Sequence, residues 1–293
     1  MASVAVSVAC ALLLSYAVSR DWFGYNWMKR NWFHDDPHKM SVWGVFMLAA
    51  VTYWTLSLLF LAAEILDIKF LTQYKTQTGK VDVNRLKPSS LGKTFLKVLF
   101  NTTVVAWICI YSFGRAMRWR TGPEGLSERL PSMWTVLWQY FAFALCAEVW
   151  FYYSHRALHS PALYKAMHKT HHEYTSPISM TAMYCHPLEF AVSNMAMLLA
   201  GPLLVGCHAS VTCMWLIVGN FVTCVEHSGL HLPLLPSPEF HDYHHWKFNQ
   251  NYGSLGLLDW LHGTDEQFKR SKQCRRTGVL LSLTPLTQSI PDE

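Results

Sequence analysis

The sequence predicts an all-α protein built as a multi-span transmembrane helical bundle. Of its 293 residues, 51% are hydrophobic and only 15% are charged, whereas a typical soluble domain carries roughly 25% charged residues. Several apolar stretches approach or exceed the roughly 20 residues that a helix needs to cross a bilayer. Trp, Tyr and Phe number 13, 13 and 16, and such side chains suit a surface at the lipid–water interface.

Six apolar stretches are the candidate spans. They are Ala2–Ser19, Met40–Ala63, Phe95–Phe113, Ser132–Tyr153, Leu188–Cys207 and Ala209–Val225. No basic residue precedes the first stretch, so a retained anchor is favoured over a cleaved signal peptide. The last two stretches have Gly201-Pro202 and Gly206 near the middle of the pair, which predicts a helical hairpin whose turn lies across the membrane or deep within it.

The distribution of fifteen histidines carries most of the functional information. Ten of them form two HxxxH and two HxxHH clusters in the order HxxxH, HxxHH, HxxxH, HxxHH. The clusters are His155/His159, His168/His171/His172, His227/His231 and His241/His244/His245. On a helix, positions three and four apart share a face, so each cluster can direct two or three imidazoles at one point.

These clusters predict a metal site. Imidazole suits iron, zinc, copper or nickel, and ten imidazoles exceed the needs of one ion but fit two ions with about five each. A lone histidine is usually a hydrogen-bonded core or interface residue, but two HxxHH clusters, each beside an HxxxH, are not accidental. The sequence lacks HExxH, so a zinc protease is not expected. It also lacks a phosphate-cradling glycine loop and a dinucleotide fingerprint, so any reducing power must arrive on another protein.

All four clusters are expected on one face of the membrane, because a hairpin lies between the second and the third. Counting spans from there places sixteen of the 24 Lys and Arg on the histidine side. The positive-inside rule then makes that side cytosolic. The formal net charge of +5 is not massed with aromatics on one segment, so no nucleic-acid partner is expected. A metal transporter would hold its ligands near the midplane of its spans, whereas these clusters lie at span ends.

From Trp134 to Phe268 the sequence resembles the fatty acid hydroxylase superfamily of membrane di-iron enzymes, which includes sterol C-4 methyl oxidases and sterol desaturases. The ordered histidine clusters carry the resemblance. The segment Tyr184-Cys-His-Pro-Leu-Glu189 and the stretch from Asn251 to Asp265 are similar to the sterol-acting branch.

The resemblance implies a bundle capped by a cytosolic helical domain that holds two iron ions, in the endoplasmic reticulum membrane. It implies activation of dioxygen with electrons from NAD(P)H, relayed by a reductase and cytochrome b5. It divides the chain into an N-terminal transmembrane region (1–131), a hydroxylase domain (132–270) and a tail (271–293). The expected ligands are His155, His159, His168, His171, His172, His227, His231, His241, His244 and His245; no catalytic residue beyond them is expected.

The leading hypothesis is a C-4 methylsterol oxidase-like monooxygenase. A fatty acyl or lipid hydroxylase, or a sterol desaturase, shares the same ligand motifs and stays open. A non-catalytic membrane protein that keeps the metal scaffold, or a zinc-binding structural protein, is the alternative from another class. Ligating imidazoles need hydrogen-bond acceptors for their second N–H, and six acids near the clusters are candidates. They are Glu148, Glu173, Glu226, Glu239, Asp242 and Asp259.

Overall fold

The computed structural model describes residues 2–77, 86–122 and 129–291, with side chains from residue 9 onward. Helices dominate this part of the chain, and the only pairing of extended backbone within it is an isolated bridge between Lys75 and Leu230. The predicted helical bundle is therefore confirmed.

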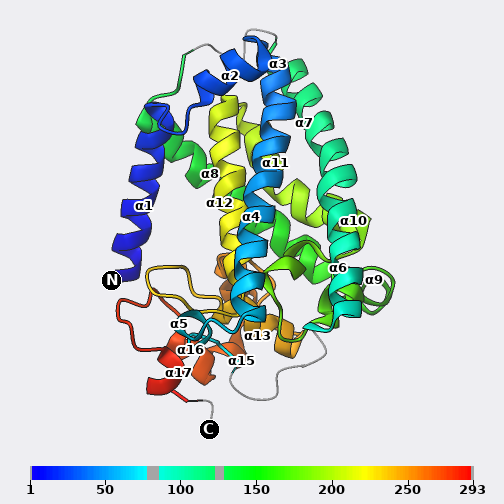
Figure 1. The fold of residues 1–293 in the computed structure, drawn as a ribbon, viewed down its shortest axis with the longest axis vertical. Coiled ribbons are helices and arrows are strands. Elements are labelled where there is room, and N and C mark those ends of the chain that lie inside the picture. The colour runs from blue at the N-terminus through cyan, green and yellow to red at the C-terminus, as the bar shows by residue number, and fades with distance from the viewer. Residues whose placement is uncertain (1, 78–85, 123–128, 292–293) are drawn as a thin grey trace.

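Long helices run roughly side by side along the molecule (Figure 1). Three of them continue through a π-helical turn: α3 (Pro37–Lys39), η1 (Met40–Gly44) and α4 (Val45–Ile65); α6 (Pro88–Phe100), η3 (Asn101–Val105) and α7 (Ala106–Thr121); and α10 (Pro187–Glu189), η6 (Phe190–Met195) and α11 (Ala196–Val205). The others are α1 (Ala2–Ser19), α8 (Met133–Leu158) and α12 (Ala209–Glu226).

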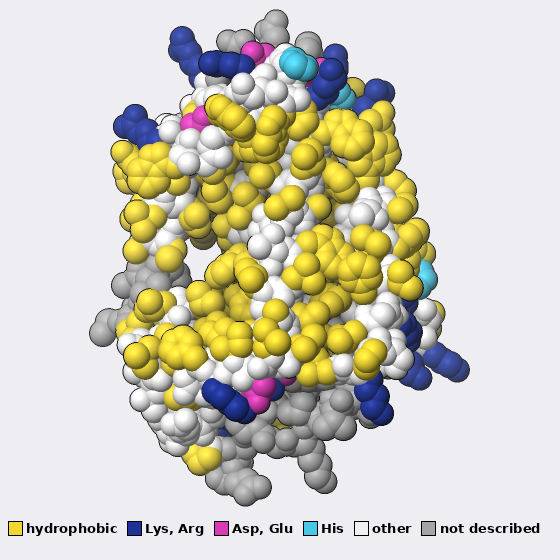
Figure 2. Space-filling view, in the orientation of Figure 1, with side chains coloured by type: hydrophobic (Ala, Val, Ile, Leu, Met, Phe, Trp, Pro, Cys, Tyr) yellow, Lys and Arg dark blue, Asp and Glu magenta, His cyan; other side chains and the backbone are white. Residues whose placement is uncertain are grey.

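Four continuous helices within the described residues are long and apolar enough to cross a membrane: Pro37–Ile65, Pro88–Thr121, Pro187–Val205 and Ala209–Glu226. They contain three of the six predicted spans and overlap a fourth, Leu188–Cys207, except at its last two residues. The other two, α1 and α8, are helical as expected but are not among these four. Apolar side chains form a broad band around the middle of the visible surface, and charged ones gather at its two ends (Figure 2). The protein is thus a multi-pass membrane protein.

The predicted hairpin is present, and its turn lies at the end of the bundle away from the histidines (Figure 1). Gly206 ends α11 with a left-handed backbone (φ 75°), a conformation that glycine adopts without steric cost. Helix α12 then begins after His208, whose Nδ1 accepts a hydrogen bond from the Ser210 N–H at 3.1 Å. The hairpin leaves and returns to the same end, so the histidine clusters on either side of it share that end.

Short helices and loops cover the histidine end. They are α5 (Lys69–Thr72), α9 (Pro161–Ala166), the 3₁₀ helices η4 (His168–Glu173) and η5 (Ser179–Met183), α13 (Glu239–Lys247), α14 (Leu257–His262), α15 (Glu266–Lys269), α16 (Lys272–Arg276) and α17 (Leu286–Ser289). Helix α2 (Tyr25–Phe33) lies at the opposite end (Figure 1). This arrangement agrees with a helical cap over the bundle.

Three contacts fix the bundle beneath the cap. Helix α11 packs so closely on α8 that a Cβ atom added to Gly201 would lie only 2.8 Å from the Cα of Phe143. Helix α4 packs on α12, and the hydroxyl of buried Tyr53 donates to the Met180 carbonyl at 2.8 Å. The amide of Asn101, in the π-helical turn η3, donates to the carbonyls of Met183 and Cys185 at 3.0 and 3.1 Å. These bonds hold the η5 segment against the membrane helices.

Candidate metal centre

Nine of the ten predicted histidines converge into two groups. In each group, one nitrogen from every imidazole lies within 4.8 Å of the others. The first group is His155, His159, His168, His172 and His244, and the second is His171, His227, His241 and His245. The first group thus has the five imidazoles expected for one ion, and the second has four.

His231 does not join either group. Its backbone N–H donates to the Tyr74 carbonyl at 2.8 Å, and its Nε2 donates to the Gly278 carbonyl at 2.8 Å. The bond to Gly278 holds the imidazole against the C-terminal segment. The HxxxH spacing placed His231 in the set, but the chain leaves helical geometry after α12 ends at Glu226, so the i, i+4 argument does not apply to it.

Each HxxHH cluster contributes two imidazoles to one group and its third imidazole to the other group. In η4, His168 and His172 enter the first group while His171 enters the second. In α13, His241 and His245 enter the second group while His244 enters the first. The η4 cluster lies on a 3₁₀ helix instead of the α-helix that the spacing suggested. The exchange interlocks the two groups, and it explains why each cluster carries two adjacent histidines.

Distances within the first group are short and regular. His168 Nε2 lies 3.1, 3.0 and 3.0 Å from the Nε2 atoms of His155, His159 and His172. His244 Nε2 lies 3.2 Å from that of His159 and 3.1 Å from that of His172. One ring nitrogen carries a single proton or lone pair, so His168 cannot form three hydrogen bonds through Nε2. These separations are therefore spacings around a common centre.

The second group has the same spacing. His241 Nε2 lies 3.1 Å from His227 Nε2 and 3.2 Å from His245 Nε2. With metal–nitrogen bonds of about 2.1 Å, neighbouring ligands at right angles stand about 3.0 Å apart. Both groups thus have the separations of adjacent imidazole ligands on one ion.

The second ring nitrogen fixes the tautomer of five of these imidazoles. Three of them donate from Nδ1 to backbone carbonyls: His155 to Tyr252 (2.8 Å), His244 to Gln250 (2.6 Å) and His245 to Tyr174 (3.1 Å). His227 Nδ1 donates to the Thr223 carbonyl at 2.9 Å and His168 Nδ1 to Glu189 Oε1 at 2.7 Å. Nε2 then carries a lone pair in each ring, and all these lone pairs face inward. Such a set repels itself until a cation occupies the centre.

Burial keeps the imidazoles in the neutral form that metal binding requires. It lowers the pKa of His171 to about 4 and, helped by the neighbouring His171, that of His227 to about 3. Burial and the nearby His155 and His171 lower the pKa of His159 to about 2. The residues therefore fit a metal ion by both geometry and protonation state.

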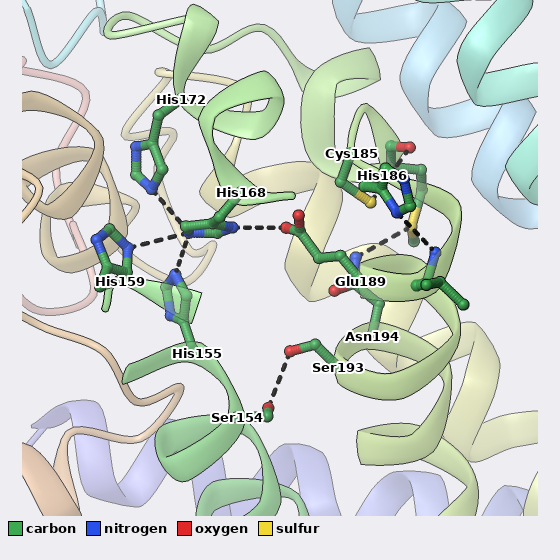
Figure 3. A network of polar contacts seen from close by, with 12 residues as sticks. Ser154, His155, His159, His168, His172, Cys185, His186, Glu189, Ser193 and Asn194 are labelled. Atoms are coloured by element: carbon green, nitrogen blue, oxygen red, sulfur yellow. Dashed lines mark hydrogen bonds and ion pairs between the residues drawn. The ribbon is translucent and has the colours of Figure 1, made fainter. Parts of the chain in front are cut away.

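Glu189 is the functional acid that the sequence did not reveal. Its Oε1 accepts from His168, the imidazole at the middle of the first group, and the side chain is 3% exposed (Figure 3). It belongs to the Tyr184–Glu189 segment identified by resemblance, but it lies 21 residues beyond His168. Only the path of the chain through η5 and α10 brings the two together. A carboxylate on the second nitrogen orients a ligating imidazole and raises its basicity.

Two of the six predicted acids support the site through loops. Glu148 accepts three backbone N–H bonds, from Ser254, Leu255 and Leu258, at 2.7–3.0 Å. Asp259 accepts the N–H groups of Tyr252 and Gly253 at 2.8 and 2.6 Å. These bonds hold the loop in which the Tyr252 carbonyl accepts the hydrogen bond from His155 Nδ1.

The other four predicted acids have different surroundings. Glu173 accepts from Lys93 and from the Tyr184 hydroxyl, and Glu239 forms a buried ion pair with Arg276 at 2.9 Å. Asp242 accepts from Thr76 and Gln77 at 3.2 and 3.0 Å. Glu226 faces a cavity.

Histidines outside the clusters have structural contacts. His186 caps α10 by accepting the Leu188 N–H at 3.2 Å. His262 stacks on Tyr152 with ring centroids 5.2 Å apart and forms a hydrogen bond to the Tyr153 hydroxyl at 3.1 Å.

A largely apolar cavity of about 250 Å³ opens onto both groups. His155 and His168 of the first group and His171, His227 and His241 of the second line it. The remaining walls come from α8, η5, the α10–η6–α11 helix, α12 and the Ser254–Leu255 loop. The site therefore joins a metal-binding end to a hydrocarbon-lined space inside the bundle.

Comparison with known proteins identifies the family of this chain. The family model described as fatty acid hydroxylase matches residues 140–264. The human fatty acid hydroxylase domain-containing protein 2 is 42% identical over 256 residues, which cover 85% of this chain and 76% of that protein. The chain belongs to the fatty acid hydroxylase family. The resemblance inferred from the histidine clusters is thus confirmed.

Other members of the fatty acid hydroxylase family differ in the activity that their names state. Methylsterol monooxygenase 2-2 of Arabidopsis thaliana is 31% identical over 260 residues, covering 84% of this chain and 93% of that protein. Fatty acid hydroxylase ahd1 of Mycosarcoma maydis is 38% identical over 189 residues, covering 62% and 48%. No solved structure matches the chain. The family supports a membrane oxidoreductase of the hydroxylase type.

Proposed function

We propose that this protein is a di-iron monooxygenase that oxidises a sterol, with the activity of a C-4 methylsterol oxidase. The observation that supports a metal-dependent oxidation is the convergence of nine imidazoles at one end of an apolar cavity. Similarity to a methylsterol monooxygenase over most of both chains supports the sterol. The proposed ligands are these nine histidines, without His231.

When bound by these nine histidines, two iron ions would supply the chemistry that reduces dioxygen and oxidises an unactivated C–H bond. One oxygen atom enters the substrate and the other leaves as water, with two electrons and two protons from outside. We propose NAD(P)H, a reductase and cytochrome b5 as the source of the electrons. The site would face the cytosol from the endoplasmic reticulum membrane, because that side carries more Lys and Arg.

The chain itself contributes three things to this reaction. Backbone carbonyls and Glu189 hold the imidazoles in one tautomer. The apolar walls exclude water, which strengthens electrostatic interactions at the site. The cavity places a hydrocarbon beside both histidine groups at once.

Fatty acyl hydroxylation is the second candidate function, and the similarity to fatty acid hydroxylase ahd1 favours it. The two substrates share the same ligand set, so the histidines do not separate them. A non-catalytic scaffold, the third alternative, would differ in the metal it carries.

A sterol profile tests the proposal. Cells that lack their own C-4 methyl oxidase would receive either this protein or His171→Ala, and 4-methyl sterols would be measured by gas chromatography–mass spectrometry. We expect the intact protein to remove them and the variant to leave them, because His171 belongs to the second group. An unchanged profile with two irons bound would contradict the sterol activity and favour an acyl lipid. Bound zinc, or no metal, would favour the scaffold.

A further inference from the structure

One face of α12 forms a long wall of the cavity. Trp215, Gly219, Val222 and Glu226 line it at spacings of three and four residues, which places them on one side of the helix. With a rise of 1.5 Å per residue, the wall extends about 16 Å from Trp215 to Glu226. The cavity is therefore elongated, and its Glu226 end adjoins His227.

Two acids line this cavity, and they differ in their hydrogen bonding. Glu189 accepts the Nδ1–H of His168. Two serines of the lining also have partners, since Ser193 pairs with Ser154 at 3.0 Å and Ser254 bonds to Glu148. Glu226, by contrast, forms no hydrogen bond or ion pair with the described residues, although its carboxylate sits among apolar walls.

A carboxylate in apolar surroundings without a partner is unfavourable for folding. Replacing it by an apolar residue would remove that penalty, so its presence indicates a partner that arrives with the ligand. A hydroxyl group is a suitable partner, because its O–H can donate to the carboxylate.

We propose that the Glu226 carboxylate accepts a hydrogen bond from a hydroxyl group of the lipid substrate, and so selects lipids whose hydroxyl lies next to the oxidised carbon. This inference rests on the proposed oxidation at the histidine groups. Glu226 directly precedes His227, and both line the cavity, so the recognised hydroxyl and the reacting carbon lie at the same end. A 3-hydroxy-4-methyl sterol has this chemistry, since its hydroxyl and its methyl group stand on neighbouring ring carbons.

Sterol binding to the purified full-length protein tests the inference without requiring turnover. The probes are a radiolabelled 3β-hydroxy-4-methyl sterol and its 3-deoxy analogue. We expect the intact protein to bind the hydroxysterol about 10- to 100-fold more tightly, the range for one hydrogen bond to a charged group. Glu226→Leu should bind both within about twofold, and Glu226→Gln should keep part of the preference, because neutral hydrogen bonds are weaker.

Glu266→Leu is the matched control, because it removes an exposed glutamate of α15 that lies outside the cavity lining. It should keep the wild-type preference. Metal content and size-exclusion elution confirm that each variant is folded, and Glu226→Gln provides the test if the leucine variant does not fold. An unchanged preference in the folded Glu226 variants, or equal binding of both sterols by the intact protein, overturns the inference.

Turnover of the same sterols separates this inference from the proposed function. If the intact protein oxidises the hydroxysterol while the Glu226 variants discriminate as it does, only the role of Glu226 fails. If the preference depends on Glu226 but the iron-loaded protein leaves the sterol unoxidised, only the proposed oxidation fails and recognition by Glu226 stands.

Discussion

The two histidine groups are built from matching halves of the sequence, yet they differ in composition. Each half contributes an HxxxH and an HxxHH cluster, and each HxxHH lends one imidazole to the other group. In the first half both HxxxH histidines, His155 and His159, enter the site. In the second half only His227 does, because His231 bonds to Gly278. The first group therefore has five imidazoles and the second has four.

Their surroundings differ as well. The first group has a carboxylate behind it, since Glu189 accepts from His168. In the second group, backbone carbonyls accept from His227 and His245. Three of the four imidazoles in the second group line the cavity, against two of five in the first. The difference indicates that the first group is the more enclosed holder of its metal, while the second leaves a position open towards the substrate.

Removing one ligand from each group should give the largest effect and the sharpest contrast. His245→Ala leaves three imidazoles, whereas His159→Ala leaves four. We expect His245→Ala to hold about one metal ion per chain and to lose at least about 100-fold in turnover, since ligands matter more than the groups behind them. His159→Ala should retain more metal. Metal analysis by mass spectrometry checks this, and equal loss in both variants would remove the distinction between the groups.

Glu189 should matter for the first group alone. Glu189→Leu leaves His168 Nδ1–H without its acceptor, and we expect the metal affinity of that group to fall about 10- to 100-fold. Glu189→Gln keeps an acceptor and should recover much of the loss. Competition with a chelator measures the two affinities separately. Weakening of the second group to the same extent would show that the carboxylate acts on the whole bundle.

A smaller effect is expected from pH on the metal-free protein. In an unfolded chain a histidine titrates near 6.5, but the folded pKa is about 4 for His171 and about 3 for His227. Below pH 6.5 the unfolded state therefore binds more protons, so stability falls as the pH falls. At pH 5 one such group should destabilise the fold by about 2 kcal/mol.

Thermal unfolding of chelator-stripped protein at pH 7.5 and pH 5 measures this effect. His171→Ala should show a smaller drop in melting temperature than the unaltered chain, because it lacks one of the depressed groups. A melting temperature that rises towards pH 5 would contradict the direction.

Much of the fold could be predicted because apolar length and helix punctuation are local properties. Each of the six predicted stretches is helical apart from one or two end residues, and Gly206 ends α11 as its position in the hairpin suggested. The shared end of the histidine clusters followed from the even number of crossings between them. The prediction missed the first residues of the helices that begin at Pro37 and Pro88, because polar first turns lower the hydrophobic signal.

The sequence by itself determined which residues would converge, apart from one, since four repeated spacings are hard to reconcile with anything but shared ligands. The tertiary structure alone decided how the imidazoles divide, that His231 turns away and that Glu189 stands behind His168. It also decided that Glu226 faces the cavity. The physical reason is that spacing along the chain fixes only neighbours within a turn or two, whereas these contacts join segments whose approach depends on how the helices pack.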